Sequence, residues 1–154
     1  MAEGEKTVVS NRKAFHDYAI EDRYEAGIVL RGAEVKALRE ARATIRDAYG
    51  AVKDGEVWLL GMQISPYSAQ STHEQLPPER PRKLLLKRGE IERLQVKIGQ
   101  KGYTLVPLRV YFSHGLAKVE LGLGRGKRAH DRREAIAERD AKREVERELR
   151  RRDR

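Results

Sequence analysis

The chain has 154 residues, enough for one compact domain with an extension, and its 39% apolar and 37% charged residues predict a modest core under a heavily charged surface. The absence of cysteine excludes disulfides and thiolate-bound metal sites, and no apolar run approaches the roughly 18 residues of a membrane span. The net charge of +9 and the pI of about 9.9 indicate a polyanionic partner, most often nucleic acid.

The N-terminal segment shows no apolar core behind its charges, so a secretory signal is not expected and the protein is predicted to be cytoplasmic. We expect residues 1–7 to be flexible. From Tyr18 to Arg31 apolar and polar residues alternate, which predicts a half-buried strand. A short helix is expected to start at Gly32, where Val35 and Leu38 share a helical face.

The middle of the chain predicts a hairpin and a helix. Asp54–Gly55 separates two strand-like runs at 43–53 and 56–65, a strong hairpin signal. A loop rich in proline and serine follows, and residues 84–98 then read as a helical segment. The residues expected to face inward are Trp58, Leu60, Met62 and Ile64 in the hairpin and Ile91, Leu94 and Ile98 in the helix.

A second hairpin is predicted from 103–112 and 116–123, joined by the sequence SHG. Pro107 cannot donate a ladder hydrogen bond, so its position is expected at an edge or a bulge. Strict alternation places Val106, Leu108, Val110 and Phe112 opposite Ala117, Val119, Leu121 and Leu123. The whole pattern is typical of a mainly β fold, a small antiparallel OB-like barrel of five or six strands with two or three short helices.

The barrel is expected to occupy residues 1–124 and a flexible basic tail residues 125–154. The tail holds 13 Lys and Arg against 8 Asp and Glu, a net of +5 out of the total +9. An isolated helix of this length is marginal in water, so we expect the tail to be disordered in the free protein and helical on a partner. Its apolar stripe comprises Ala137, Ala141, Val145 and Leu149.

No pattern in the sequence predicts catalysis, a cofactor or a metal site. The segment GLGRGKR lacks the spacing of a nucleotide-binding phosphate loop, because Leu121 and Arg128 stand where Gly and Ser or Thr are required. The four histidines are scattered without metal-ligand spacing: they are His16, His73, His114 and His130. We therefore expect a protein that is not an enzyme.

RNA binding is better supported by the residue pattern. The segment RPRKLLLKR carries five basic residues in nine and predicts either a solvated helix end or a patch that contacts an RNA backbone. SNRKAFHDY mixes hydrogen-bond donors with rings that can stack on bases. Glu25 is either a solvent-facing strand charge or a group that orients a nearby cation or accepts a hydrogen bond from a base amine.

Several segments together resemble one family, and they occur in its order from about Val8 to the tail. They are SNRKAFHDY, YEAGIVLRGAEVKALR, STH with PPERPRKLLL, KGYTLVPL and AKVELGLGRGKRAHDRR. The chain thereby resembles the SmpB family, the SsrA-binding proteins of bacterial trans-translation. The resemblance implies a non-catalytic adaptor whose OB-like barrel binds the tRNA-like domain of transfer-messenger RNA and mimics the missing anticodon arm.

The resemblance also implies that the RNA, alanylated by alanyl-tRNA synthetase and delivered with elongation factor Tu, links the protein indirectly to both. The tail would reach the decoding centre and the empty mRNA channel of a stalled ribosome. Matching motifs make Asn11, Glu25, Lys83, Leu85 and Lys118 the RNA-binding positions, with Arg12, Lys13 and Arg82 beside them. The matching tail positions for ribosome binding are Gly126, Lys127, Arg128, His130, Asp131, Arg132, Arg133 and Ile136.

The sequence departs from the family pattern at two positions. Phe15 stands where many members have a basic residue, which favours stacking over a phosphate contact, and Pro77 replaces an acidic residue. Gly124 and Gly126 are expected to permit a swivel between barrel and tail. We expect a monomer without a membrane partner. The competing hypothesis is a general ribosomal or RNA-binding barrel with a basic tail, and a nuclease or nucleotide-dependent enzyme is a third class.

Overall fold

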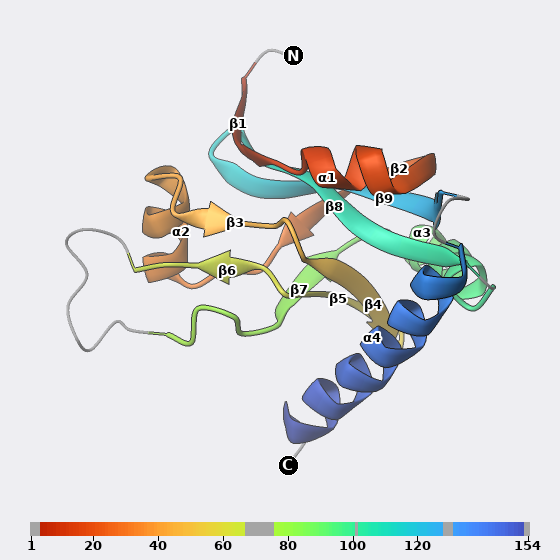
Figure 1. The fold of residues 1–154 in the computed structure, drawn as a ribbon. Helices are drawn as coiled ribbons and strands as arrows, with labels where there is room; N and C mark the ends of the chain where they lie inside the picture. The colour runs from red at the N-terminus through yellow and green to blue at the C-terminus, as the bar shows by residue number, and fades with distance from the viewer. Residues whose placement is uncertain (1–3, 67–75, 101, 128–130, 153–154) are drawn as a thin grey trace.

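The computed structural model describes residues 4–66, 76–100, 102–127 and 131–152, and only the backbone of 131–138 and of residue 152. Figure 1 shows the arrangement, with the strands at the centre and the last helix along one side. The elements are β1 (Glu5–Ser10), α1 (Arg12–Asp17), β2 (Tyr18–Ile28), α2 (Gly32–Arg39), β3 (Ala43–Thr44), β4 (Tyr49–Lys53), β5 (Glu56–Leu60), β6 (Gln63–Ile64), β7 (Arg82–Leu85), α3 (Arg88–Ile98), β8 (Tyr103–Ser113), β9 (Leu116–Gly126) and α4 (Asp131–Arg152).

The main sheet has seven strands in the order β1-β8-β4-β5-β7-β2-β9, and β8 also pairs with β9. The six strands from β8 to β9 therefore form a closed antiparallel ring, with β1 added on the outside of β8. This confirms the predicted mainly β, OB-like barrel. The predicted strand-like runs 43–53 and 56–65 each contain two strands. Their outer ends, β3 and β6, form a separate two-stranded sheet. Residues 5–7, expected to be flexible, are paired with Tyr111–Ser113 of β8.

Neighbouring strands of the ring differ in how many residues they pair. β2 and β9 pair over nearly their whole length, whereas β4 meets β8 at the single register pair Gly50–Leu105. A Cβ atom on Gly50 would lie 2.5 Å from Leu105 Cδ2. The missing side chain therefore lets β4 approach β8 closely enough to close the barrel.

A bulge in β8 corrects the predicted alternation. The register shifts between Pro107 and Arg109, so the side chains change face at this point. Leu105, before the bulge, lies in the main core, as do Val110 and Phe112 after it. Val106 and Leu108 were predicted on that same face; instead they lie in a small cluster with Ala14 of α1 on the other side of the sheet. Proline at a bulge matches the expectation for Pro107.

The alternation predicted for 58–64 is wrong in its first half. Val57 and Leu59 lie in the main core, while Trp58 and Leu60 point to the opposite face of β5. Gly61 follows with φ +80°, a left-handed conformation that changes the phase of the chain. After it, Met62 and Ile64 return to the core as predicted.

Residues 82–85 form a strand, although the sequence pattern predicts a helix from Leu84. β7 lies between β5 and β2, where Leu84 enters the core and Leu85 points outward. The helix begins only at Arg88, where the Lys87 amide donates to Glu90 Oε1 at 3.0 Å and so satisfies one of the free amides at the helix start. Sheet pairing on both sides of β7 overrides the local helical pattern here.

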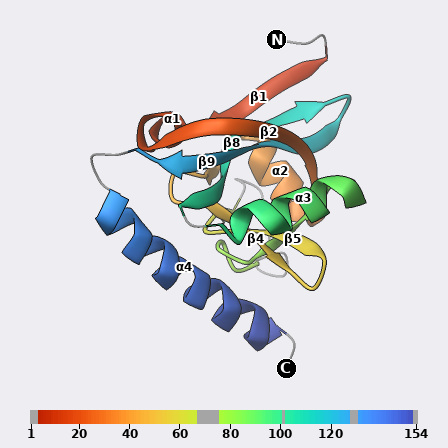
Figure 2. The ribbon, with the colours of Figure 1, turned by 90° about the vertical axis from the view of Figure 1, so that its right-hand side faces the viewer.

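The C-terminal helix α4 runs diagonally past the barrel (Figure 2). Of the predicted stripe, Val145 and Leu149 are buried and Ala141 is half-buried, while the side chain of Ala137 lies outside the described residues. Disorder of the tail in the free protein stays a prediction. No helix within the described ranges is long and apolar enough to cross a membrane.

Candidate RNA-binding face

The outward side of β8, β9, β2 and β7 carries a continuous band of polar and charged side chains, which we call the outer face. It exists because the inward positions of these strands, such as Ala26 and Val119, fill the core, and the intervening residues point the other way. Register pairs align these residues in rows, with Tyr111 opposite Lys118, Lys118 opposite Gly27, and Gly27 opposite Leu85. Residues from four strands thus lie in one row on the outer side of the barrel.

Glu25 of β2 is held by two donors on the outer face. Lys118 Nζ donates to Glu25 Oε1 at 2.8 Å, and the Tyr111 hydroxyl donates to Glu25 Oε2. The Lys118 hydrogen bond, followed by that of Tyr111, lowers the pKa of Glu25. The carboxylate is therefore ionised at neutral pH, and because the side chain is 53% exposed, its free lone pairs can accept a hydrogen bond from a partner.

A second layer of contacts fixes Tyr111 beneath Glu25. Tyr111 is 1% exposed, and burial, followed by the hydrogen bond to Glu25, raises its pKa, so the hydroxyl keeps its proton. The Arg109 guanidinium lies 4.0 Å from the Tyr111 ring centroid and donates to Glu120 at 2.9 Å and to Glu5 at 3.1 Å. These contacts pre-organise the donor–acceptor pattern before any partner binds.

The row ends at β7 in an apolar side chain. Leu85 is 53% exposed beside Gly27, and Lys83, two residues earlier, donates to Glu56 Oε1 at 3.0 Å. Lys83 is 40% exposed, so an exposed ion pair of this kind is weak and can exchange its carboxylate for a phosphate. A cation, a carboxylate and an apolar side chain are therefore all at least partly exposed on the outer face.

Asn11 has an internal role in the structure. Its side chain is 4% exposed, its Oδ1 accepts from the Ala14 amide at 3.2 Å, and its amide donates to the carbonyls of Ile45 and Pro107 at 3.2 and 3.0 Å. It therefore caps α1 and joins that helix to β8. The adjacent cations Arg12 and Lys13 are exposed, and Lys13 pairs with Asp47 at 3.3 Å.

Replacing Asn11 with alanine should lower the free energy of unfolding by about 1–3 kcal/mol, because it removes the cap and leaves two buried carbonyls without their donor. Urea unfolding followed by circular dichroism measures this change. Arg12→Ala is the matched control, since its side chain is exposed on the same helix, and it should leave stability nearly unchanged. Equal stability of N11A and wild type would contradict the internal role.

Arg82 is also used inside the protein. Its side chain is 1% exposed; Nε donates to Glu34 Oε2 at 2.9 Å, and the two terminal nitrogens donate to the carbonyls of Met62 and Pro78 at 2.6 and 3.0 Å. Arg80 donates to the same carboxylate. In this structure Arg82 therefore anchors β7 to α2 and has almost no exposed surface, and its assignment to RNA binding stays a prediction.

The tail positions are placed only in part. Gly126 is the last residue of β9 and pairs with Tyr18, and the Lys127 amide donates to the Asp17 carbonyl at 3.1 Å. Gly124 lies within β9, where a Cβ would meet the Tyr18 Cβ at 3.0 Å, so it is a packing position and not the expected swivel. Arg128 and His130 lie outside the described residues; the backbone of Asp131, Arg132, Arg133 and Ile136 belongs to α4, but their side chains lie outside the description.

No sequence motif points to Tyr111, Arg109 or Glu120, because their contacts depend on strand register. Tyr111 lies 86 positions from Glu25 in the chain. The available signal was the alternation of Arg109 and Tyr111 with the core residues Val110 and Phe112. Within the described ranges, no group of three or more His, Cys, Asp or Glu residues could hold a metal ion.

Comparison with known proteins supports the resemblance over nearly the whole chain. The family model "SmpB protein" matches residues 8–151. An SsrA-binding protein of Thermobifida fusca is 55% identical over 150 residues, covering 97% of this chain and 93% of that protein. One of Acidothermus cellulolyticus is 57% identical, again covering 97% and 93%.

A solved structure agrees with the fold. A chain from "tmRNA-SmpB: a journey to the center of the bacterial ribosome" superimposes with a TM-score of 0.66 at 46% identity, covering 83% of this chain and 93% of that one. The family model and the relatives each span far more than half of the chain. The barrel with its charged outer face and C-terminal helix thus belongs to a member of the SmpB family.

Proposed function

We propose that the protein is a cytoplasmic, non-catalytic adaptor that binds the tRNA-like domain of transfer-messenger RNA and brings it to stalled ribosomes for trans-translation. One observation carries the proposal: the exposed carboxylate of Glu25 is held ready between Lys118 and Tyr111 in a chain whose relatives are SsrA-binding proteins. Elongation factor Tu and alanyl-tRNA synthetase are linked to it through the RNA.

The chemistry of the outer face supports RNA as the ligand. Lys118 and Lys83 supply cations for phosphates, which give affinity but little selectivity. Glu25 accepts a hydrogen bond from a base amine and repels bare phosphate, so it favours an exposed base edge over a duplex backbone. Leu85 offers an apolar surface beside it. This combination is suited to a folded RNA with unpaired bases.

The tail supports a second contact, with the small ribosomal subunit. Residues 125–154 carry a net charge of +5 and no core of their own. We propose that the segment from Gly126 to Ile136 contacts the decoding centre and that α4 follows into the empty mRNA channel. Its cations would then face ribosomal RNA.

A titration tests the proposal. Full-length protein should bind the tRNA-like domain more tightly than an ordinary tRNA at both low and moderate salt, and the affinity should fall as salt rises because Lys and Arg displace counterions from phosphates. Fluorescence anisotropy of labelled RNA measures both quantities. The general RNA-binding alternative predicts salt dependence without selectivity, so equal affinity for the two RNAs would defeat the adaptor assignment.

A variant separates the two contacts. Ala141→Pro breaks α4 without changing the barrel. We expect it to bind the tRNA-like domain as wild type does, yet to lose most rescue of ribosomes stalled on a message without a stop codon. Ala141→Ser is the matched control, and rescue by the proline variant at the wild-type level would contradict a role for the tail helix.

A further inference from the structure

The β4–β5 hairpin is apolar on both of its faces. Its inward side chains, among them Val57 and Leu59, belong to the barrel core. Its outward side carries Tyr49 opposite Leu60 and Ala51 opposite Trp58, two directly facing register pairs that we call the β4–β5 strip. A barrel strand that faced solvent on its outer side would carry polar residues there, so the strip needs a cover.

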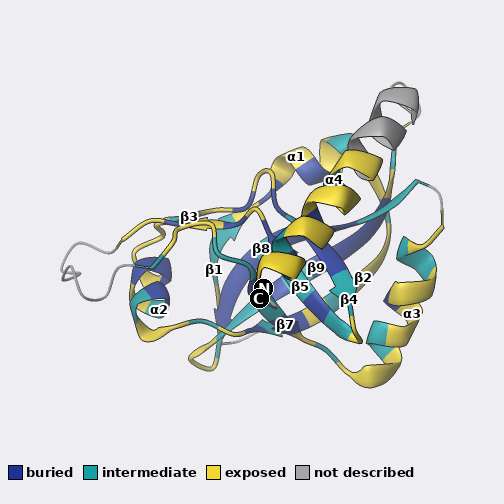
Figure 3. Ribbon diagram, turned by 90° about the horizontal axis from the view of Figure 1, so that it is seen from below, coloured by how far each residue is buried: buried dark blue, intermediate teal, exposed yellow. Residues whose placement is uncertain are grey.

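The cover in the structure is α4. Val145 and Leu149, one helical turn apart, are 7% and 4% exposed and form one apolar cluster with the strip. Figure 3 shows the helix lying across the hairpin with its exposed side turned away from the barrel. The exposed residues include the cations Arg139, Lys142, Arg143, Arg147, Arg150 and Arg151. The helix is therefore amphipathic, with its apolar side on the strip and its basic side toward solvent.

The electrostatics at Tyr49 agree with this placement. Burial raises the pKa of the Tyr49 hydroxyl to about 12, and the nearby Glu144 and Glu148 of α4 add to the effect. Glu144 and Glu148 thus lie near a neutral ring of the strip, and the basic residues remain at the surface. The docked helix leaves the positive charge of the tail available to a polyanion.

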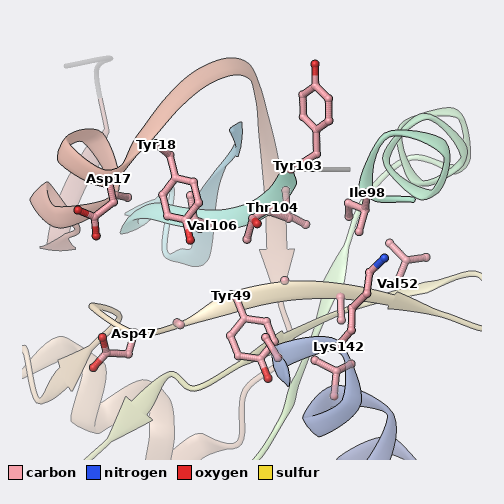
Figure 4. A pocket seen from close by; sticks show the side chains of 18 of the residues that line it. Asp17, Tyr18, Asp47, Tyr49, Val52, Ile98, Tyr103, Thr104, Val106 and Lys142 are labelled. Atoms are coloured by element: carbon pink, nitrogen blue, oxygen red, sulfur yellow. The ribbon is translucent and has the colours of Figure 1, made fainter. Parts of the chain in front are cut away.

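The contact is small and incomplete. A cleft of about 690 Å³ separates the preceding turns of α4 from the barrel between α1, β4 and the start of β8. Figure 4 shows Tyr18, Val106 and Lys142 around this space. Among the described side chains of α4, Val145 and Leu149 are the buried ones. Burial of two aliphatic side chains stabilises the docked helix only modestly, so docking is reversible.

We propose that the β4–β5 strip is the resting site of the protein's own α4, and that α4 has to leave the strip before the tail can engage a ribosome. The second half rests on the proposed function, whereas the first half does not. In the free protein the described part of the tail is then a helix docked on the barrel and is not fully disordered. It also assigns Tyr49, Ala51, Trp58 and Leu60 a role outside RNA binding.

Trp58 is the only tryptophan in the sequence, so its fluorescence reports the docking directly. Val145→Ser/Leu149→Ser in the full chain should reduce the docked population on the order of tenfold or more, shift the emission to longer wavelength and raise quenching by acrylamide. Arg143→Ser/Arg147→Ser is the matched control, with two serines at the same spacing on the exposed side. It should behave like wild type.

The same experiment contains the results that would overturn the proposal. Equal quenching of Trp58 in wild type, V145S/L149S and the control would mean that α4 does not rest on the strip. A difference that grows with protein concentration would mean that the helix docks on a second copy of the chain. Neither measurement uses RNA, so failure here is distinct from failure of the adaptor function.

A change on the barrel side tests the release step while keeping the tail sequence. Ala51→Glu introduces a charge into the strip and should undock α4, as judged by Trp58, without lowering affinity for the tRNA-like domain. If docking restrains the tail, the complex of this variant with transfer-messenger RNA should engage stalled ribosomes faster than wild type. An unchanged rate despite the undocked spectrum would overturn release as a required step.

Discussion

Replacing Glu34 with alanine should lower the free energy of unfolding by about 3–5 kcal/mol. Glu34 is 4% exposed and accepts from the Arg31 amide, from Arg80 and from Arg82, which is itself 1% exposed. Without this carboxylate, the Arg82 guanidinium remains buried with no opposite charge. The loss is large because removing one member of a buried pair exposes the full desolvation cost of the other.

Urea unfolding at several pH values measures this effect. Burial raises the pKa of Glu34, but the hydrogen bonds of Arg80 and Arg31 outweigh it, so the pKa is lower in the folded state. The stability it confers is therefore present above the unfolded-state pKa and is lost as the pH falls through the folded-state pKa. The free energy of unfolding of E34A should therefore fall less steeply than that of wild type as the pH is lowered. Glu34→Leu/Arg82→Met should be more stable than E34A, and equal destabilisation by both would argue against the buried pair.

Replacing Glu25 with alanine should weaken binding of the tRNA-like domain by about 10–100-fold, which corresponds to about 1.4–2.8 kcal/mol. The change removes an ionised acceptor from the outer face and leaves Lys118 and the Tyr111 hydroxyl without their shared partner. Affinity for ordinary duplex RNA should change little or rise, because the lost charge repels phosphate. Glu25 therefore contributes to selectivity more than to general affinity.

Anisotropy titrations with both RNAs measure this difference. Tyr111→Phe is the informative companion, since it keeps the carboxylate and removes only one of its two donors; its effect should be in the same direction and smaller. Glu56→Ala is the control, an exposed carboxylate paired with Lys83 at the border of the face. Unchanged selectivity in a folded E25A protein would remove Glu25 from the recognition site.

The fold class was predictable because the strongest signals are local. The alternation in β2 and the Asp54–Gly55 turn specify a strand and a hairpin regardless of their neighbours. The errors occur where tertiary contacts set the outcome. The run Val57–Leu60 is apolar throughout because both sides of β5 are covered, so alternation could not tell its two faces apart. β7 looked helical because its pairing partners, β5 and β2, are distant in the sequence.

The site residues assigned from the sequence also fall into two groups, those that are exposed and those that are buried. Glu25, Lys83, Leu85 and Lys118 were assigned from matching motifs, and the structure places all four at the surface or partly exposed. Their role in binding RNA stays a prediction. Asn11 and Arg82 show why polar residues in a binding motif need not face the ligand: their hydrogen bonds are made inside the protein. Composition cannot distinguish these two uses of a polar side chain.

Because β8 pairs with β1, β4 and β9, it limits which strands can pair while the chain is being synthesised. β1 and β4 can pair with β8, and β2 with β9, only after the last hairpin is made. The nascent chain up to α3 can therefore form the β2–β7, β7–β5 and β5–β4 pairings and the separate β3–β6 pair. The ring closes only when the final hairpin leaves the exit tunnel. The barrel can therefore reach its native form only at this late stage, because the β1–β8, β4–β8 and β2–β9 pairings all need that hairpin.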